Sequence, residues 1–172
     1  MDINRKQLEK DLKAYIEANY VEEEMLFRTK AVLMECNSFD GIAGGIEEME
    51  AELDERLSVE EDTFSQRLLS LIEQKKLNNA DVYKDAALDK KVFSKLKNNK
   101  DYQPNKLTAL RLCIGAKLTV EEAKELLALA GYAFSPCNKL DLVFQFFLER
   151  QNYDIYELDI QLENNGLPCF IN

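Results

Sequence analysis

Apolar residues recur three and four positions apart along most of this chain, which is the period of an amphipathic α-helix. Leu8, Leu12, Tyr15 and Ile16 follow this spacing and predict a helix over about residues 4–19. The 172 residues include only six Gly and three Pro, too few for the many tight turns of an all-β fold. We therefore predict an all-α fold of about seven to nine helices, without strands.

Helix start signals locate several of these helices. Thr63 with Gln66, and Thr119 with Glu122, have the spacing of a capping box. They predict one helix over 64–75 and another that stops at Gly131. The weaker signals predict a helix over 21–36, a loop at 40–45, an acidic helix over 46–57, a helix start near Asn105, a helix over 139–150 and a last helix from Asp154 to near Gly166.

Composition excludes several classes of function. Histidine is absent, which excludes Ser-His and Cys-His nucleophile pairs, HExxH zinc sites and histidine bases. We expect no enzymatic activity, no catalytic or metal site and no cofactor. No apolar run reaches the ~18 residues of a membrane span, so we expect a cytoplasmic protein without a membrane partner. Isolated thiols with no CxxC pair fit a reducing cytosol, and there are four: Cys36, Cys113, Cys137 and Cys169.

Charge is distributed unevenly along the chain, whose formal net charge is −10. Residues 64–118 carry 12 basic and 5 acidic residues, a net charge of +7, while the segments before and after carry −11 and −6. A basic block inside an acidic chain indicates a surface for a polyanion. The alternative is that these basic residues simply pair with their acidic neighbours.

The apolar spacing from Phe64 to Leu127 resembles the five-helix domain of lambda-repressor-like (XRE-type) helix-turn-helix proteins. The resemblance implies a lambda-repressor-like bundle with additional N-terminal and C-terminal helices. It assigns the five helices to 64–75, 79–86, 89–98, 105–117 and 120–130, the second being the scaffold helix and the third the recognition helix. It implies a transcriptional regulator that binds double-stranded DNA as a homodimer on two half-sites.

The candidate DNA-binding residues lie on and around the implied recognition helix. Val82, Ala86, Leu88, Val92, Phe93 and Leu96 are spaced to pack the two short helices together, which leaves the intervening polar residues outside. The candidate base readers are Lys90, Lys91, Ser94 and Asn98. The candidate phosphate contacts are Lys84, Lys95, Lys97, Lys100 and Lys106, together with Asn78, Asn79 and the first amides of the scaffold helix.

Two residues depart from the helix-turn-helix pattern. Tyr83 stands where the family usually has a small residue, and Ala87 stands where it usually has Gly at the turn. Ala at a positive φ costs roughly 1 kcal/mol relative to Gly, so we expect a longer or remodelled turn. The outer face also offers lysines rather than arginines, which favours affinity over sequence choice. The alternative function is a helical protein-interaction module that keeps this fold without binding DNA.

Residues Thr63 to Phe170 also resemble a helical module found behind macro domains and in stand-alone proteins of Firmicutes-type bacteria. This resemblance implies no activity, and in that module Tyr83 is an ordinary residue. The residues that carry it are Phe64-Ser65-Gln66, Leu68-Leu69, Tyr83-Lys84, Phe93-Ser94-Lys95, Tyr102, Pro104, Lys106, Thr108-Ala109-Leu110, Leu127, Ala130-Gly131-Tyr132-Ala133-Phe134-Ser135 and Asn152-Tyr153-Asp154-Ile155.

We divide the chain into an acidic helical N-terminal segment (1–62), a helix-turn-helix-like domain (63–135) and a C-terminal helical extension packed on it (136–172). The acidic residues 46–62 have three interpretations: a solvated helix that packs on the module or on its twin, a helix that covers the basic face, or a helix that docks on a protein partner. The apolar stripe of the extension is expected in the core, or on a dimer surface if one domain cannot bury it: Leu140, Val143, Phe144, Phe147 and Leu148.

Overall fold

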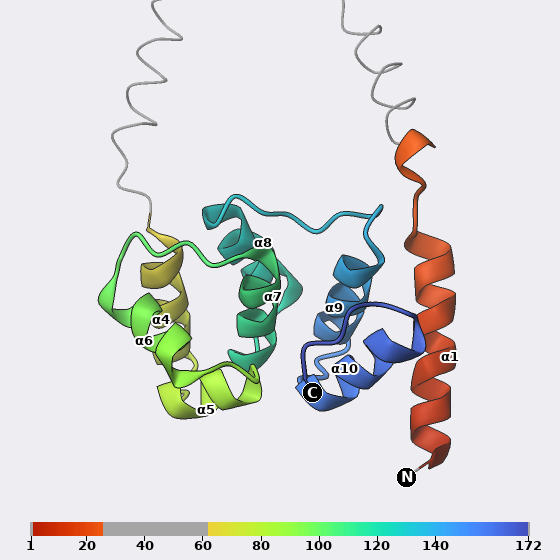
Figure 1. Cartoon of the computed structure of the whole chain (residues 1–172), viewed down its shortest axis with the longest axis horizontal. Coiled ribbons are helices and arrows are strands. Elements are labelled where there is room, and N and C mark those ends of the chain that lie inside the picture. The colour runs from red at the N-terminus through yellow and green to blue at the C-terminus, as the bar shows by residue number, and fades with distance from the viewer. Residues whose placement is uncertain (1, 26–61, 172) are drawn as a thin grey trace, which may run out of the picture. The chain divides into compact units, whose positions relative to one another are not determined.

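A computed structural model describes residues 2–25 and 62–171 of the chain. The fold is all-α, as predicted, with eight helices and no strand among these residues. The predicted loop at 40–45, the acidic helix over 46–57 and most of the predicted helix over 21–36 lie outside them. The helices are α1 (Asp2–Asn19), α4 (Phe64–Gln74), α5 (Asn79–Asp85), α6 (Lys90–Asn98), α7 (Lys106–Gly115), α8 (Val120–Leu129), α9 (Lys139–Glu149) and α10 (Ile155–Asn164) (Figure 1).

The chain divides into two units, one formed by residues 1–20 and 62–172 and the other by residues 21–61. The description that follows concerns the first unit, which contains all eight helices. Across the described part of the chain, no helix combines the length and the apolar character needed to cross a bilayer.

The predicted helix starts are confirmed by side-chain caps. Thr63 and Thr119 both form the reciprocal capping box, with Gln66 and Glu122 as their partners. Other helix starts use an Asn or Asp whose side-chain oxygen accepts a backbone N–H of the first turn. These residues are Asn78, Asp89, Asn105, Asn138 and Asp154.

Six helices end in the same turn, in which one residue takes a left-handed conformation. The residue after it donates its N–H to a carbonyl five positions earlier. The prediction of a longer turn at Ala87 is wrong: Ala87 itself takes φ +50°, and Leu88 N–H bonds Tyr83 O at 2.8 Å. Lys76, Lys117, Gly131, Gln151 and Gly166 take the same conformation, with φ between +52° and +75°. Three of the turns, at 76–78, 87–89 and 117–119, have the same order of residues: a left-handed residue, then Leu, then the residue that caps the next helix.

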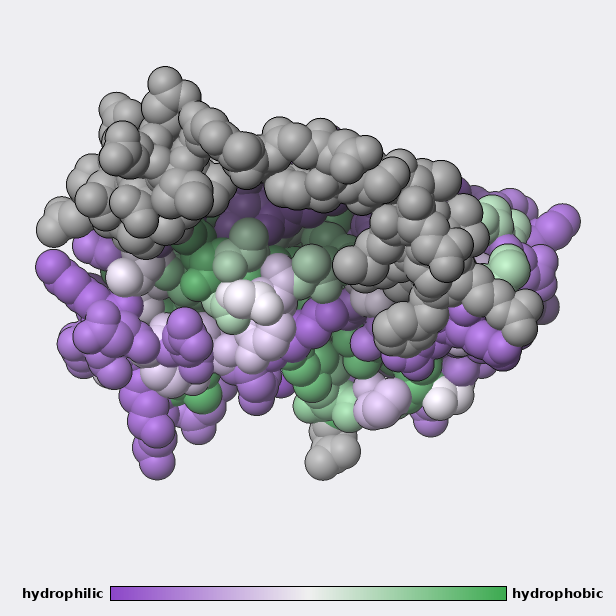
Figure 2. Space-filling model, turned by 90° about the horizontal axis from the view of Figure 1, so that it is seen from above, coloured by the Kyte–Doolittle hydropathy of each residue, from purple (hydrophilic) through white to green (hydrophobic). Residues whose placement is uncertain are grey.

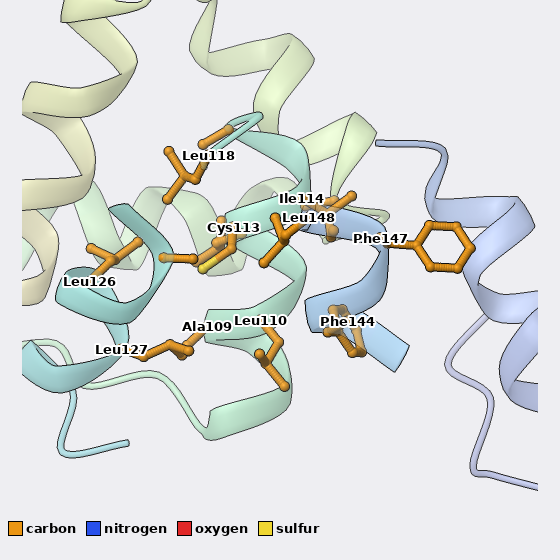
Figure 3. Close-up of a cluster of buried hydrophobic side chains, with 14 of the residues drawn as sticks. Ala109, Leu110, Cys113, Ile114, Leu118, Leu126, Leu127, Phe144, Phe147 and Leu148 are labelled. Carbon is orange, nitrogen blue, oxygen red and sulfur yellow. The ribbon is translucent and has the colours of Figure 1, made fainter. Parts of the chain in front are cut away.

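Helix α7 lies in the middle of the core and is apolar on nearly every side. Its buried residues meet those of α8 and α9 in one cluster (Figure 3). Cys113 is fully buried, and burial raises the pKa of its thiol to about 12. Four of the five residues of the predicted apolar stripe belong to this core, since Val143, Phe144, Phe147 and Leu148 are at most 1% exposed, and Leu140 is half-buried against it. The stripe is therefore not available as a dimer surface.

Helix α1 packs on α9, although it is far from α9 in the sequence (Figure 1). Leu12 and Ile16 are buried, and the Tyr15 ring meets Phe146 edge-on at 5.2 Å. Two ion pairs fasten the helix: Arg150 with Asp11 at 2.9 Å, and Arg5 with Glu157 at 2.8 Å. The N-terminal helix is therefore part of the same unit as the C-terminal helices.

Candidate nucleic-acid interface

Helix α6 is a short helix with one buried side and one open side. Asp89 caps it by accepting Lys91 N–H at 2.7 Å. Phe93 and Leu96 are buried against α4 and α5, and the Phe93 ring lies 5.9 Å from that of Tyr83. Tyr83 therefore helps to join α5 to α6, which gives the bulky residue a packing role in this turn.

The open side of α6 carries the predicted DNA-binding residues. At 100° per residue, Ser94 and Asn98 lie along its middle, and lysines flank them on both sides. Asn98 Nδ2 donates to Ser94 Oγ at 3.3 Å. Hydrophilic side chains project from the end of the molecule where α4 and α6 lie (Figure 2). We define the lysine face as seven exposed residues: Lys90, Lys91, Ser94, Lys95, Lys97, Asn98 and Lys100.

The basic block separates into bound and unbound side chains. Five of its 12 basic residues have partners: Arg67, Lys75, Lys106, Arg111 and Lys117. The other seven are lysines with no ion pair to any residue that the structure describes, and five of these belong to the lysine face. Pairing with acidic neighbours therefore accounts for less than half of the block.

Lys106 lies apart from the lysine face, at the junction of α7 and α9. Its ammonium group pairs with Oδ2 of Asp141, a fully buried carboxylate that also accepts Ser135 N–H at 2.8 Å. This charge neutralises a buried acid, so we leave Lys106 out of the interface. Lys84 is exposed on α5, beside an open groove of about 500 Å³ that also contains the Lys117–Asp85 ion pair.

The start of α5 carries a side-chain cap and an acidic residue. Asn78 is exposed, but its side-chain oxygen already accepts Ala80 N–H at 3.0 Å. Asp81 adds a negative charge to the first turn, and the helix has only seven residues. Asn79 is half-buried at this end. The Asn78 cap and the charge of Asp81 thus both make this helix start a less favourable place for a phosphate.

One residue that the sequence analysis did not single out contacts the turn before α6. Arg111 of α7 donates from Nε to Ala86 O at 3.0 Å and from a terminal nitrogen to Ala87 O. A lone Arg in an apolar helix was a signal in the sequence, but its partners are backbone atoms 24 and 25 residues away, which no local pattern specifies.

Within residues 2–25 and 62–171, no three His, Cys, Asp or Glu side chains gather as they would around a metal ion. No protein-family model, curated protein or solved structure matches this chain.

Proposed function

We propose that this chain is a nucleic-acid-binding protein of the helix-turn-helix type, a transcriptional regulator that binds double-stranded DNA through the lysine face of α6. The observation that carries the proposal is the concentration of five lysines, none of them ion-paired to a residue that the structure describes, on and next to one nine-residue helix. An α-helix fits the major groove of B-form DNA. Cations on its exposed side supply the phosphate contacts that dominate affinity.

The arrangement of residue types on α6 favours a duplex over a single strand. The neutral pair Ser94 and Asn98 occupies the middle of the exposed side, where a helix in the major groove meets base edges. Lys90 and Lys97 lie on one flank, and Lys91 and Lys95 on the other. In this proposal Lys90 and Lys91, which the sequence analysis predicted as base readers, instead contact the phosphate strands that border the groove, together with Lys95 and Lys97. Regulators of this type bind as homodimers on two half-sites, so we include a homodimer in the proposal.

The test compares two charge-reversal variants of equal net charge. Replacing Lys90, Lys91 and Lys95 by Glu should abolish binding to a labelled duplex at low salt, measured by fluorescence anisotropy. The control replaces three exposed lysines on other helices, Lys6, Lys10 and Lys124, and should retain most of the binding. Equal loss in both variants would show that net charge, rather than the lysine face, controls binding, and would refute the proposal.

A second candidate is a helical protein-interaction module that keeps this fold without binding DNA. The net charge of −10 and the absence of Arg from α6 favour it, because the whole chain repels a polyanion and lysine gives little geometric selectivity. A wild-type chain that fails to bind any duplex at low salt would select this candidate.

A further inference from the structure

The turn between α5 and α6 is held by contacts that come from elsewhere in the fold. Ala87 occupies the left-handed region at φ +50°, a conformation that Gly adopts without cost and Ala does not. Arg111 donates to the carbonyls of Ala86 and Ala87, the two residues that follow α5. Helices α5 and α6 are the two shortest described helices, with seven and nine residues, and the hydrogen bonds from Arg111 add to the packing of Tyr83 on Phe93 that also joins them.

Arg111 is held in turn by the C-terminal part of the chain. Its guanidinium carbon lies 4.4 Å from the centroid of the Phe170 ring. The buried carboxylate of Asp159 accepts Phe170 N–H at 2.9 Å and Ile171 N–H at 3.3 Å, which fixes the ring in place. Burial lowers the pKa of Arg111, and the negative charge of Asp159 opposes that shift. Contacts therefore run without a break from α10 and residues 170–171 to the turn.

We propose that Arg111 is a positioning residue for α6: held against the ring of Phe170, whose backbone Asp159 anchors, its guanidinium keeps the α5–α6 turn in the left-handed form that presents the lysine face. A turn that opens part of the time leaves only a fraction of molecules competent to bind, and the apparent affinity falls by that fraction. The part of this inference that concerns DNA affinity rests on the proposed function, whereas the part that concerns the turn does not.

The first measurement is amide hydrogen exchange on the full chain, with no DNA present. Arg111→Met removes both hydrogen bonds and keeps the apolar stem. It should speed exchange of the Ala87 and Leu88 amides, which bond Lys84 O and Tyr83 O, by roughly tenfold. Amides in the middle of α8 should change little. Unchanged exchange at Ala87 and Leu88 would overturn the inference.

The second measurement is a cycle of duplex affinities with Ala87→Gly, which relieves the left-handed strain. In the wild type the turn is already formed, so Ala87→Gly alone should alter affinity by less than about twofold. Arg111→Met should weaken binding roughly tenfold with the same salt dependence, because the same lysines still reach the phosphates. Adding Ala87→Gly to Arg111→Met should restore most of the loss, which damage to the α7 core would not permit. Failure to restore it would overturn the inference.

Two further outcomes separate the possible failures. If exchange at the turn rises in Arg111→Met but no form of the chain binds a duplex, the proposed function fails and the positioning of α6 stands. If Arg111→Met does not fold, Phe170→Leu provides the test, because it removes the ring beneath the guanidinium and keeps an apolar side chain. It should raise exchange at Ala87 and Leu88 in the same direction by a smaller factor, and no change there would overturn the inference.

Discussion

Gly115, at the end of α7, is predicted to be intolerant of even one added methyl group. A Cβ built there would lie 2.4 Å from Val82 O, 2.8 Å from Ala86 Cβ and 2.9 Å from Ala86 N. These atoms belong to α5 and to its C-cap residue Ala86, and two of them are backbone atoms. The clash with Gly115→Ala can therefore be relieved only by moving α5 away from α7.

The expected cost follows from these distances. Overpacking a close contact costs about 1–3 kcal/mol, and rigid backbone neighbours place Gly115→Ala near the upper end of that range. Ala gains up to about 1 kcal/mol over Gly in a helix interior, and less at the last residue of a helix. We expect a net loss of about 2 kcal/mol in the free energy of unfolding, or roughly 4–8 °C in Tm for a chain of this length.

The matched control is Gly131→Ala, which makes the same chemical change after α8. Gly131 has φ +75°, and nothing lies within 4 Å of an added Cβ. Its cost should come from backbone strain alone, about 1 kcal/mol or roughly 2–4 °C. Urea and thermal unfolding followed by circular dichroism measure both variants. A Gly115→Ala variant as stable as the wild type, or more stable than Gly131→Ala, would refute the close α5–α7 packing.

Three further predictions concern charge and reactivity. Asp89→Asn keeps a good helix cap and removes a negative charge beside the lysine face, so duplex affinity in anisotropy titrations should rise about two- to fivefold with little change in Tm. Burial alone would raise the pKa of Glu122, but hydrogen bonds from Lys75 and the Thr119 backbone lower it below its usual value. The ionised carboxylate therefore stabilises the fold above its usual pKa, and this stabilisation is lost as the pH falls. Glu122→Gln should reduce the free energy of urea unfolding at pH 7 more than at low pH, and equal losses would contradict this. Cys169 should react readily with a maleimide in the folded protein, whereas buried Cys113 should react only on unfolding, as peptide mapping by mass spectrometry would show.

Local signals predicted the helices well because each start is a short-range contact. Thr63 and Thr119 bond amides only three residues away, so the Thr-x-x-Glu/Gln pattern is sufficient to locate them. The turn at Ala87 was mispredicted because the preference for Gly over Ala at a positive φ is too weak to decide the conformation of a turn by itself. The hydrogen bonds from Arg111, which come from a different helix, act on the same turn and are not visible locally.

The candidate site was predictable only as a set of residue types. The apolar spacing of Phe93 and Leu96 correctly placed the lysines of α6 on its outer side. The same reasoning grouped Lys106 with them, since a count of charges cannot show that Asp141 is buried and needs a cation. The docking of α1 on α9 also depends on contacts between residues more than 100 positions apart, such as Arg150 with Asp11.

The central claim is that the unpaired lysines of this acidic chain bind the phosphates of a duplex, and the salt dependence of binding measures this most directly. Six of the seven lysines of the basic block with no ion-pair partner among the described residues are candidate phosphate contacts: Lys84, Lys90, Lys91, Lys95, Lys97 and Lys100. If all six contact phosphates, a plot of log affinity against log salt has a slope of about −5. Replacing Lys90, Lys91 and Lys95 by Gln should reduce that slope to about −3. No binding at about 50 mM salt, or the same slope in both proteins, would contradict the account.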